Sequence, residues 1–308
     1  MNTRRKKNSS GLVALVLLFL ILLVAGYAIY ALSASAALPE TLPDSQYMPR
    51  QSLALALDEI PDTEPSSLML APTNINNIIY TGYLALINRN HGISAEPDGH
   101  SLVMAWPTVP VSFVDGMYVH STALQAVADM FDTFRRTDIG TLFISSGFRG
   151  LALQTELYNN GDNGGFAMPP GHSEHHTGLA VDILAIGISQ AEMANSAEGR
   201  WLAANSYRYG LILRYPQDAT HITGIEFEPW HFRYVGRPHA YYMKQHNLVL
   251  EEYIELLQAT GGLTFEMGGR IYHVLHQTPQ SGMIYLPQGV EFTVSSDNTG
   301  GFILTAWE

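Results

Sequence analysis

Two short segments, distant from each other in the sequence, carry side chains of the types that bind metals, and a metal site requires a fold that brings them together. The first segment is SEHHTGLAVD at 173–182, and the second is EPWH at 228–231. His175, Asp182 and His231 are side chains that bind zinc, and catalytic zinc is typically held by three protein ligands with a fourth position open. Glu228 is a spare carboxylate that can accept a proton from an attacking water. The pattern therefore predicts one metal ion with hydrolase chemistry.

The local pattern around the first segment explains how a loop and a strand can converge on one ion. In a strand over 178–184, Gly178, Ala180 and Asp182 share one face because side chains alternate. The two small residues leave space above that face, and His175 follows a Pro-Pro-Gly turn at 169–171. Taken alone, each segment is more often structural, with a hydrogen-bonded aspartate and an ordinary histidine. Their joint occurrence favours the metal site.

Composition limits which side chains can bind a metal and which partners the protein can bind. The 308 residues contain no cysteine, so a metal must bind His, Asp or Glu, and 46% hydrophobic content is ample for a core. Four positive charges lie in the run RRKK at 4–7. Beyond that run, 12 basic and 28 acidic residues remain, a net charge of −16. Nucleic-acid binding needs a basic face, so we expect no nucleic-acid partner.

The N-terminal region predicts export. Residues 11–32 form a 22-residue stretch without a charge, and a rise of about 1.5 Å per residue lets it cross a hydrocarbon layer of about 30 Å. The basic run before it should stay inside the cell. The stretch therefore predicts a single-pass membrane anchor with the rest of the chain outside. The alternative is a signal peptide cleaved near Ala36, although such apolar regions are usually only about 7–15 residues long.

The chain divides into five parts on this interpretation. Residues 1–10 are a cytoplasmic basic tail and 11–32 the transmembrane anchor. A proline-rich extracellular linker follows at 33–75. Residues 76–250 form the catalytic domain, and 251–308 a C-terminal helix with a small β appendage.

Hydrophobic periodicity and turn residues predict the secondary structure. Strands are expected at 78–87, 141–145, 178–184, 211–214 and 231–235, and in the tail at 263–267, 270–277, 283–286, 290–295 and 302–306. Helices are expected at 122–136, 150–159, 196–209, 237–246 and 249–258. Thr122 and Gln125 form a capping-box pattern, Ser196 is an expected N-cap, and Gly210 an expected helix stop.

Further side chains are candidates for the same site. Arg149 follows a strand that runs into a glycine turn, where a guanidinium can hold a carboxylate or an oxyanion. On that segment alone, a surface ion pair is the alternative interpretation. His172 and His176 have the spacing of a metal pair on a helix, but the preceding Pro-Pro-Gly turn disfavours a helix there.

Four segments, in the same order along the chain as in a known family, resemble that family. SSGFR at 145–149, SEHHTGLAVD at 173–182, YGLILRYP at 209–216 and EPWHFRYVG at 228–236 resemble the VanY-type D-alanyl-D-alanine carboxypeptidases. These are zinc peptidases of the superfamily that includes lysostaphin-type enzymes and the hedgehog signalling domain. The resemblance spans 76–250. It implies an α+β fold, in which a small antiparallel sheet carries the zinc and helices flank it.

The resemblance also implies residue roles. His175, Asp182 and His231 match the zinc ligands, Glu228 the catalytic base, and Arg149 the arginine that stabilises substrate and oxyanion.

Two more residues match substrate-binding positions of the family, and two positions depart from its pattern. Ser173 matches the motif serine, and Gln154 lies where a pocket glutamine is often found. Phe148 replaces a common tyrosine, and His176 replaces a common glutamine. The role of position 176 is therefore open.

The resemblance implies that one zinc ion serves removal of the C-terminal D-alanine from peptidoglycan stem peptides. The expected partners are those peptides and the membrane, with no obligate protein partner. One alternative is an L,D-carboxypeptidase that acts on tetrapeptide stems, and another is an endopeptidase. A third is a non-catalytic zinc-bearing ectodomain that binds the cell wall.

Overall fold

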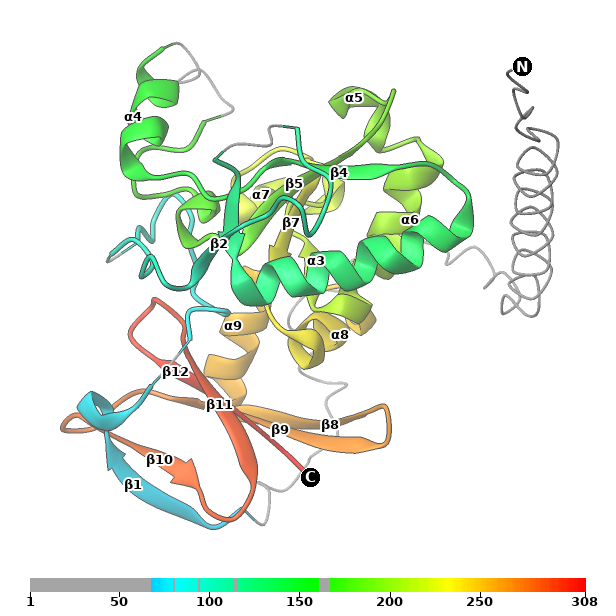
Figure 1. The fold of residues 1–308 in the computed structure, drawn as a ribbon. Helices are drawn as coiled ribbons and strands as arrows, with labels where there is room; N and C mark the ends of the chain where they lie inside the picture. The colour runs from blue at the N-terminus through cyan, green and yellow to red at the C-terminus, as the bar shows by residue number, and fades with distance from the viewer. Residues whose placement is uncertain (1–67, 80, 94, 113–115, 161–166) are drawn as a thin grey trace, which may run out of the picture. The chain divides into compact units, whose positions relative to one another are not determined.

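The structure, a computed structural model, describes residues 68–79, 81–93, 95–112, 116–160 and 167–308 (Figure 1). The predicted tail, the predicted membrane anchor and most of the predicted linker lie outside these residues. Within the described part of the chain, no helix is long and apolar enough to span a bilayer. The content is mixed α and β with small antiparallel sheets, as the fold class predicts.

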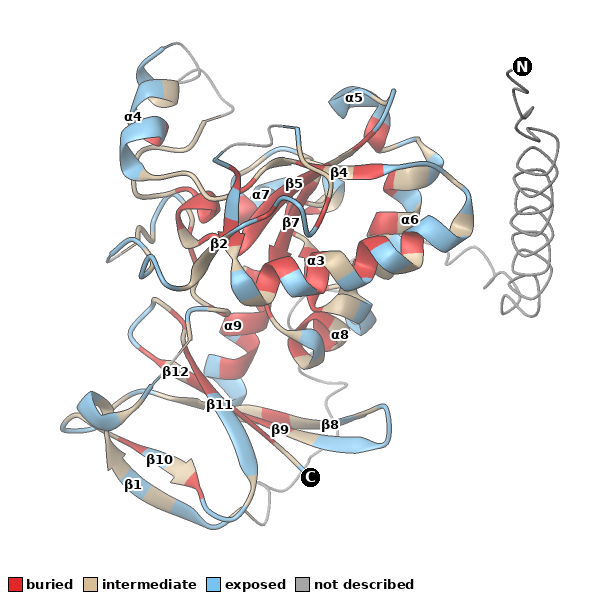
Figure 2. Ribbon diagram, in the orientation of Figure 1, coloured by how far each residue is buried: buried red, intermediate tan, exposed pale blue. Residues whose placement is uncertain are grey.

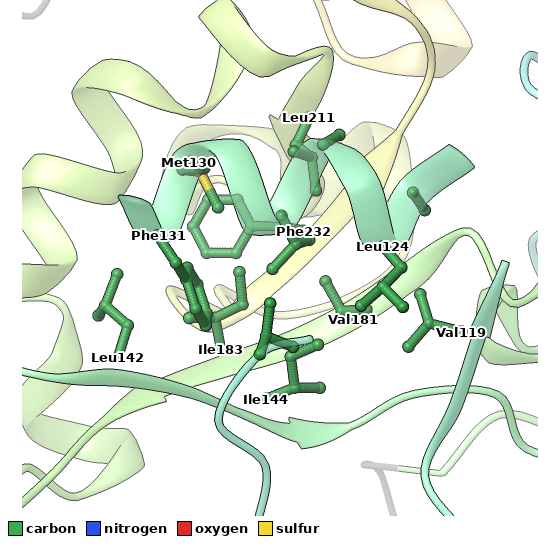
Figure 3. Close-up of a cluster of buried hydrophobic side chains, with 14 of the residues drawn as sticks. Val119, Leu124, Met130, Phe131, Leu142, Ile144, Val181, Ile183, Leu211 and Phe232 are labelled. Carbon is green, nitrogen blue, oxygen red and sulfur yellow. The ribbon is translucent and has the colours of Figure 1, made fainter. Parts of the chain in front are cut away.

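A four-stranded antiparallel sheet forms the centre of the region predicted to be catalytic. Its order is β4 (Leu142–Ser146), β5 (Ala180–Ala185), β7 (His231–Tyr234) and β6 (Leu211–Leu213). All four strands were predicted within two residues of these bounds. Side chains of the sheet pack together beneath a helix in a close-packed cluster (Figure 3). This cluster fixes the backbone from which the site residues project.

Helix α3 (Ser121–Phe134) covers that cluster. Its apolar residues recur at helical spacing, so one side of the helix is buried and the other exposed (Figure 2). The helix follows β3 (Tyr118–His120), which pairs with β2 (Leu102–Met104). His120 is the N-cap, and its Nδ1 accepts a hydrogen bond from the Thr122 backbone N–H at 3.2 Å. The predicted capping box at Thr122 is therefore wrong, because Thr122 already lies inside the helix.

The other predicted helices are present. They are α4 (Leu151–Asn159), α6 (Ala197–Asn205), α8 (Arg237–Gln245) and α9 (Leu250–Thr260), with short helices α5 (Gln190–Met193) and α7 (Thr220–Thr223). Ser196 caps α6 as predicted. The 3₁₀ turn η5 (Ser206–Tyr209) follows α6, and Gly210 ends it at a φ of 85°. The expected helix over 196–209 thus changes to 3₁₀ geometry in its last turn.

The predicted strand at 78–87 is wrong. In its described residues only Thr81 forms an isolated bridge, to Ser295. The backbone turns at 83–84 and buries Leu84 and Leu86. The Arg233 guanidinium donates hydrogen bonds to three of its carbonyl groups, those of Gly82, Tyr83 and Ala85. Thr81 instead exchanges backbone hydrogen bonds with Val294 and Ser296. After Thr81, an arginine side chain distant in sequence therefore binds carbonyl groups that a strand ladder would have paired.

The C-terminal residues form a second four-stranded antiparallel sheet, as the alternating pattern predicts. Its order is β11 (Glu291–Ser296), β12 (Phe302–Trp307), β9 (Arg270–Gln277) and β8 (Gly262–Met267). Strand β10 (Met283–Pro287) pairs with β1 (Leu70–Asn74). Residues 70–74 were assigned to the linker, so that part of the linker has regular structure. Helices α8 and α9 share a hydrophobic cluster with this second sheet.

Candidate active site

Two of the three predicted metal ligands are cross-strand neighbours. Asp182 on β5 lies opposite His231 on β7 in the sheet register. The His231 Nδ1 atom is 2.9 Å from Asp182 Oδ1. Antiparallel pairing thus places side chains 49 positions apart next to each other.

The third predicted ligand comes from a short turn before β5. His175 lies on the 3₁₀ turn η4 (Glu174–Thr177), and the Ser173 hydroxyl accepts a hydrogen bond from its backbone N–H at 3.3 Å. Gly178 ends the turn with a φ of 67°, where a Cβ atom would lie 2.6 Å from the Leu102 side chain. The turn brings His175 Nε2 to 3.5 Å from Asp182 Oδ2. The ligand atoms of His175, Asp182 and His231 lie within 4.8 Å of one another, and all three residues are buried.

Hydrogen bonds to the far nitrogen of each imidazole fix its orientation. His175 Nδ1 is 2.8 Å from the Gly147 carbonyl oxygen, which leaves Nε2 to face Asp182. His231 Nε2 is 3.5 Å from Glu174 Oε2, which leaves Nδ1 to face Asp182. Histidine ligands in metal sites usually donate their second N–H to a carbonyl or carboxylate in this way. Both rings are therefore oriented for binding one ion.

Glu174 is a buried carboxylate that contacts the site and to which the sequence analysis assigned no role. Arg214 Nε donates a hydrogen bond to Glu174 Oε1 at 2.8 Å, and Arg233 Nη1 lies 3.1 Å from the same oxygen. All three side chains are fully buried. Burial alone would raise the pKa of Glu174, but the two guanidinium groups hold it far below its usual range. The sequence did carry one signal for such a residue. It places two arginines in apolar predicted strands, and buried charges require partners of opposite charge.

The electrostatics of the three predicted ligands fit a bound cation. Burial lowers the pKa of His175, so its imidazole is neutral and can donate a lone pair. Burial opposes ionisation of Asp182, yet His175 and His231 hold the pKa of its carboxyl well below its usual range. Burial also opposes protonation of His231, but its hydrogen bonds with Asp182 and Glu174 raise its pKa to about 10, so a cation that binds Nδ1 displaces a proton from it. Two imidazoles and one carboxylate match the donor set of a catalytic zinc site.

Glu228 lies beside this group, in the loop before β7. Its Oε2 atom is 3.8 Å from His231 Nδ1, and 17% of its side chain is exposed. Burial raises the pKa of Glu228 to about 7. A carboxyl group with such a pKa can accept and return a proton near neutral pH.

Arg149 is held by two side chains. Its Nη1 donates to Gln154 Oε1 at 3.0 Å, and its Nη2 donates to Ser146 Oγ at 3.2 Å. Gln154, fully buried on α4, donates in turn to the Met168 carbonyl. Burial lowers the pKa of Arg149, and the negative charges of Asp182 and Glu228 only partly oppose that shift. The structure therefore brings Arg149 into the same electrostatic cluster and makes Gln154 its support.

Comparison with known proteins identifies the family. Residues 116–237 match the family model described as VanY, D-alanyl-D-alanine carboxypeptidase. A D-alanyl-D-alanine carboxypeptidase of Enterococcus faecium is 32% identical over 237 residues, which cover 74% of this chain and 76% of the relative. This chain belongs to the VanY family. It is a carboxypeptidase of the zinc metallopeptidase class, and its predicted metal ligands fit that ion.

Two solved structures are similar to this VanY-family chain. One is the vancomycin-resistance D,D-dipeptidase VanXYg in complex with a D-Ala-D-Ala phosphinate analogue, with 25% identity and a TM-score of 0.68. The alignment covers 79% of this chain and 100% of VanXYg. The other is the LD-carboxypeptidase LdcB, with 34% identity and a TM-score of 0.51 over 56% of this chain and 86% of LdcB. Both the D,D and the L,D specificities thus occur among its structural neighbours.

Two histidines near the VanY-family site brace loops and lie outside the metal group. His176 is fully buried, with Nδ1 2.6 Å from the Arg149 carbonyl oxygen and Nε2 accepting a hydrogen bond from the Gly171 N–H. His172 Nδ1 is 2.8 Å from the Asn88 carbonyl oxygen. His176 therefore fixes the backbone of Arg149, which gives a structural role to the position that departs from the family pattern.

Proposed function

We propose that this VanY-family enzyme removes the C-terminal D-alanine from peptidoglycan stem peptides, with Glu228 as proton acceptor. His175, Asp182 and His231 would hold the single zinc ion, and Arg149 would stabilise the substrate. The observation that carries the assignment is the position of Glu228, because its carboxylate lies 3.8 Å from His231 Nδ1 and its pKa is raised to about 7.

The chemistry follows from the charges around the scissile peptide bond. When bound, zinc supplies a Lewis acid that polarises the substrate carbonyl and activates water. Glu228 accepts a proton from the attacking water as the new carbon–oxygen bond forms. Glu228 then donates that proton to the departing amine nitrogen as the carbon–nitrogen bond breaks. The Arg149 guanidinium faces the negative charge that develops on the carbonyl oxygen.

Ser173 and Gln154 complete the proposed substrate site. The family resemblance assigns both to substrate binding. Gln154 acts through Arg149, whose guanidinium it holds. The Ser173 hydroxyl accepts a hydrogen bond from the backbone of His175, so it also shapes the turn that carries this ligand.

The decisive experiment replaces the proposed proton acceptor. Glu228→Gln keeps the size of the side chain but removes the base, so kcat should fall about 10²–10⁴-fold. Zinc content, measured by elemental analysis, should stay at the wild-type level because Glu228 is not a ligand. Glu226→Gln, at an exposed position two residues earlier, is the matched control and should keep its rate. Near-wild-type turnover by Glu228→Gln would refute the role.

The same assay distinguishes the two specificities. Wild-type enzyme is incubated with pentapeptide stems that end in D-Ala-D-Ala and with tetrapeptide stems, and the products are identified by mass. Loss of one alanine from the pentapeptide supports the proposal. Cleavage of the tetrapeptide alone would favour the L,D-carboxypeptidase activity, which the likeness to LdcB brings into consideration.

We also propose that residues 11–32 anchor the enzyme in the membrane, with the catalytic domain outside the cell. The support is the uncharged 22-residue stretch and the basic run before it. In intact spheroplasts, added protease should then degrade the catalytic domain, and the protein should remain with the membranes after a high-salt wash. Release of a soluble form that begins near residue 37 would instead indicate cleavage after Ala36.

A further inference from the structure

A network of four charged side chains lies beneath the metal site. Arg214 and Arg233 contribute two positive charges, and Glu174 and Glu251 contribute two negative charges. The side chains of the two arginines and of Glu174 are fully buried, and that of Glu251 is 13% exposed. The network is therefore neutral as a whole, and it needs every member because an uncompensated buried charge is costly.

Arg214 supports His231 from two sides. Its Nε donates to Glu174, whose other oxygen lies 3.5 Å from His231 Nε2. Its guanidinium also lies over the Tyr215 ring, with 4.9 Å between the guanidinium carbon and the ring centroid. The Tyr215 ring packs against the His231 ring, with a centroid distance of 4.9 Å and an interplanar angle of 31°. The position of Arg214 thus sets the hydrogen-bond partner and the packing surface of one predicted ligand.

Glu251 fixes the plane of that guanidinium. Its two carboxylate oxygens accept hydrogen bonds from Arg214 Nη1 and Nη2 at 2.8 and 2.7 Å. Such paired bonds fix orientation as well as distance. Glu251 lies on the first turn of α9, beyond the residues 116–237 that match the family model.

We infer that Glu251 is a positioning residue for the metal site. It acts through Arg214 and Glu174 and keeps the His231 ring turned so that Nδ1 faces the ion. In Glu251→Gln one carboxylate oxygen becomes an NH2 donor, so one Nη group of Arg214 loses its acceptor and the charge pair is lost. The guanidinium can then rotate away from Glu174 and Tyr215. The inference deepens the proposed function, because it concerns how the metal site of that enzyme is held. It makes helix α9 part of the catalytic unit.

The test is Glu251→Gln in the full-length, zinc-loaded protein. Supporting groups outside the ligand shell typically change metal affinity or activity about 10–100-fold, and we expect the lower end of that range. Zinc affinity is measured by competition with a chelator, and kcat and KM are measured on a peptide that ends in D-Ala-D-Ala. The zinc dissociation constant should rise and kcat should fall, each by about 10-fold, with KM unchanged.

The controls separate positioning from simple stabilisation. Glu255→Gln changes the same residue type one turn further along α9, where the side chain is exposed, and should leave all three quantities unchanged. A Glu251→Gln protein that is folded by circular dichroism and keeps wild-type zinc affinity and kcat overturns the inference, even if its melting temperature falls.

If Glu251→Gln does not fold, the same measurements are made on Glu251→Asp, which keeps the charge but shortens its reach. Weaker zinc binding by this variant supports the inference, and wild-type affinity overturns it. A wild-type protein that binds zinc but leaves the peptide intact would refute the proposed function while leaving the affinity comparison valid.

Discussion

Two histidines of similar burial behave in opposite ways. His231 in the metal site and His239, where α8 meets the C-terminal sheet, are 4% and 5% exposed. The nitrogens of His231 face the carboxylates of Asp182 and Glu174, and its pKa rises to about 10. The nitrogens of His239 face the hydroxyl groups of Tyr253 and Thr305, and burial lowers its pKa to about 3.

The difference shows what makes a buried imidazole a candidate metal ligand. Burial alone disfavours the charged form, so a histidine between hydroxyl groups stays neutral and serves packing. Carboxylates on both sides create a negative environment that favours a proton or a metal ion. The metal site around His231 therefore depends on buried acids and on the arginines whose positive charges compensate them.

Removing the buried acid Glu174 should have the largest effect on the difference between the two histidines. Glu174→Gln leaves Arg233 without its ion-pair partner and His231 without its second carboxylate. We expect zinc affinity to fall about 10–100-fold and the free energy of unfolding to fall by about 3–5 kcal/mol. Chelator competition and chemical denaturation measure the two effects.

The matched control for that change is Glu156→Gln, at an exposed position on α4. It should alter neither zinc affinity nor stability. If Glu174→Gln retained wild-type zinc affinity, the orientation of His231 would not depend on this carboxylate. The contrast between the two histidines would then not explain why one of them binds metal.

The pH dependence of stability, a smaller effect, tests the neutral histidine His239. The pKa of His239 falls from 6.5 to about 3 on folding, so the unfolded chain binds more protons between these values. Stability should therefore fall as the pH drops from about 6.5 towards 3, by up to about 1.4 kcal/mol per pH unit from this group. His239→Gln should remove that share, as denaturation at pH 7 and pH 4.5 would show.

His221→Gln, at an exposed site on α7, is the control and should keep the wild-type pH dependence. An unchanged pH dependence in His239→Gln would mean that acid sensitivity arises in other groups. Since Asp182 and Glu174 also have depressed pKa values, both variants should still lose stability in strong acid.

Periodicity and local residue chemistry were sufficient for most secondary-structure elements. The strands of both four-stranded sheets alternate or run apolar between turn residues, and the caps at Ser196 and Gly210 are local signals. The segment at 78–87 misled because Leu84, Leu86 and Ile87 are buried around a turn, whereas Ile79 is exposed. One of its backbone partners, the Arg233 guanidinium, lies about 150 positions away and leaves no trace in the local pattern.

The same limit applies to the site. The predicted ligands and Glu228 are grouped in two short segments, so the sequence was sufficient to predict them as site residues. The role of Glu174 depends on Arg214, 40 positions further along, and the role of Arg214 depends on Glu251, another 37 positions away. Only the folded chain shows these pairings, because a charged residue in the sequence does not specify its partner.

The spread of these partners along the chain has a consequence for synthesis. Arg233 holds the carbonyl groups of Gly82, Tyr83 and Ala85, while Arg214 depends on α9. A nascent chain that has reached residue 237 already contains every predicted zinc ligand, yet its Arg214 still lacks Glu251. On the inference that Glu251 positions the metal site, a chain that ends before α9 should bind zinc less tightly than the whole chain.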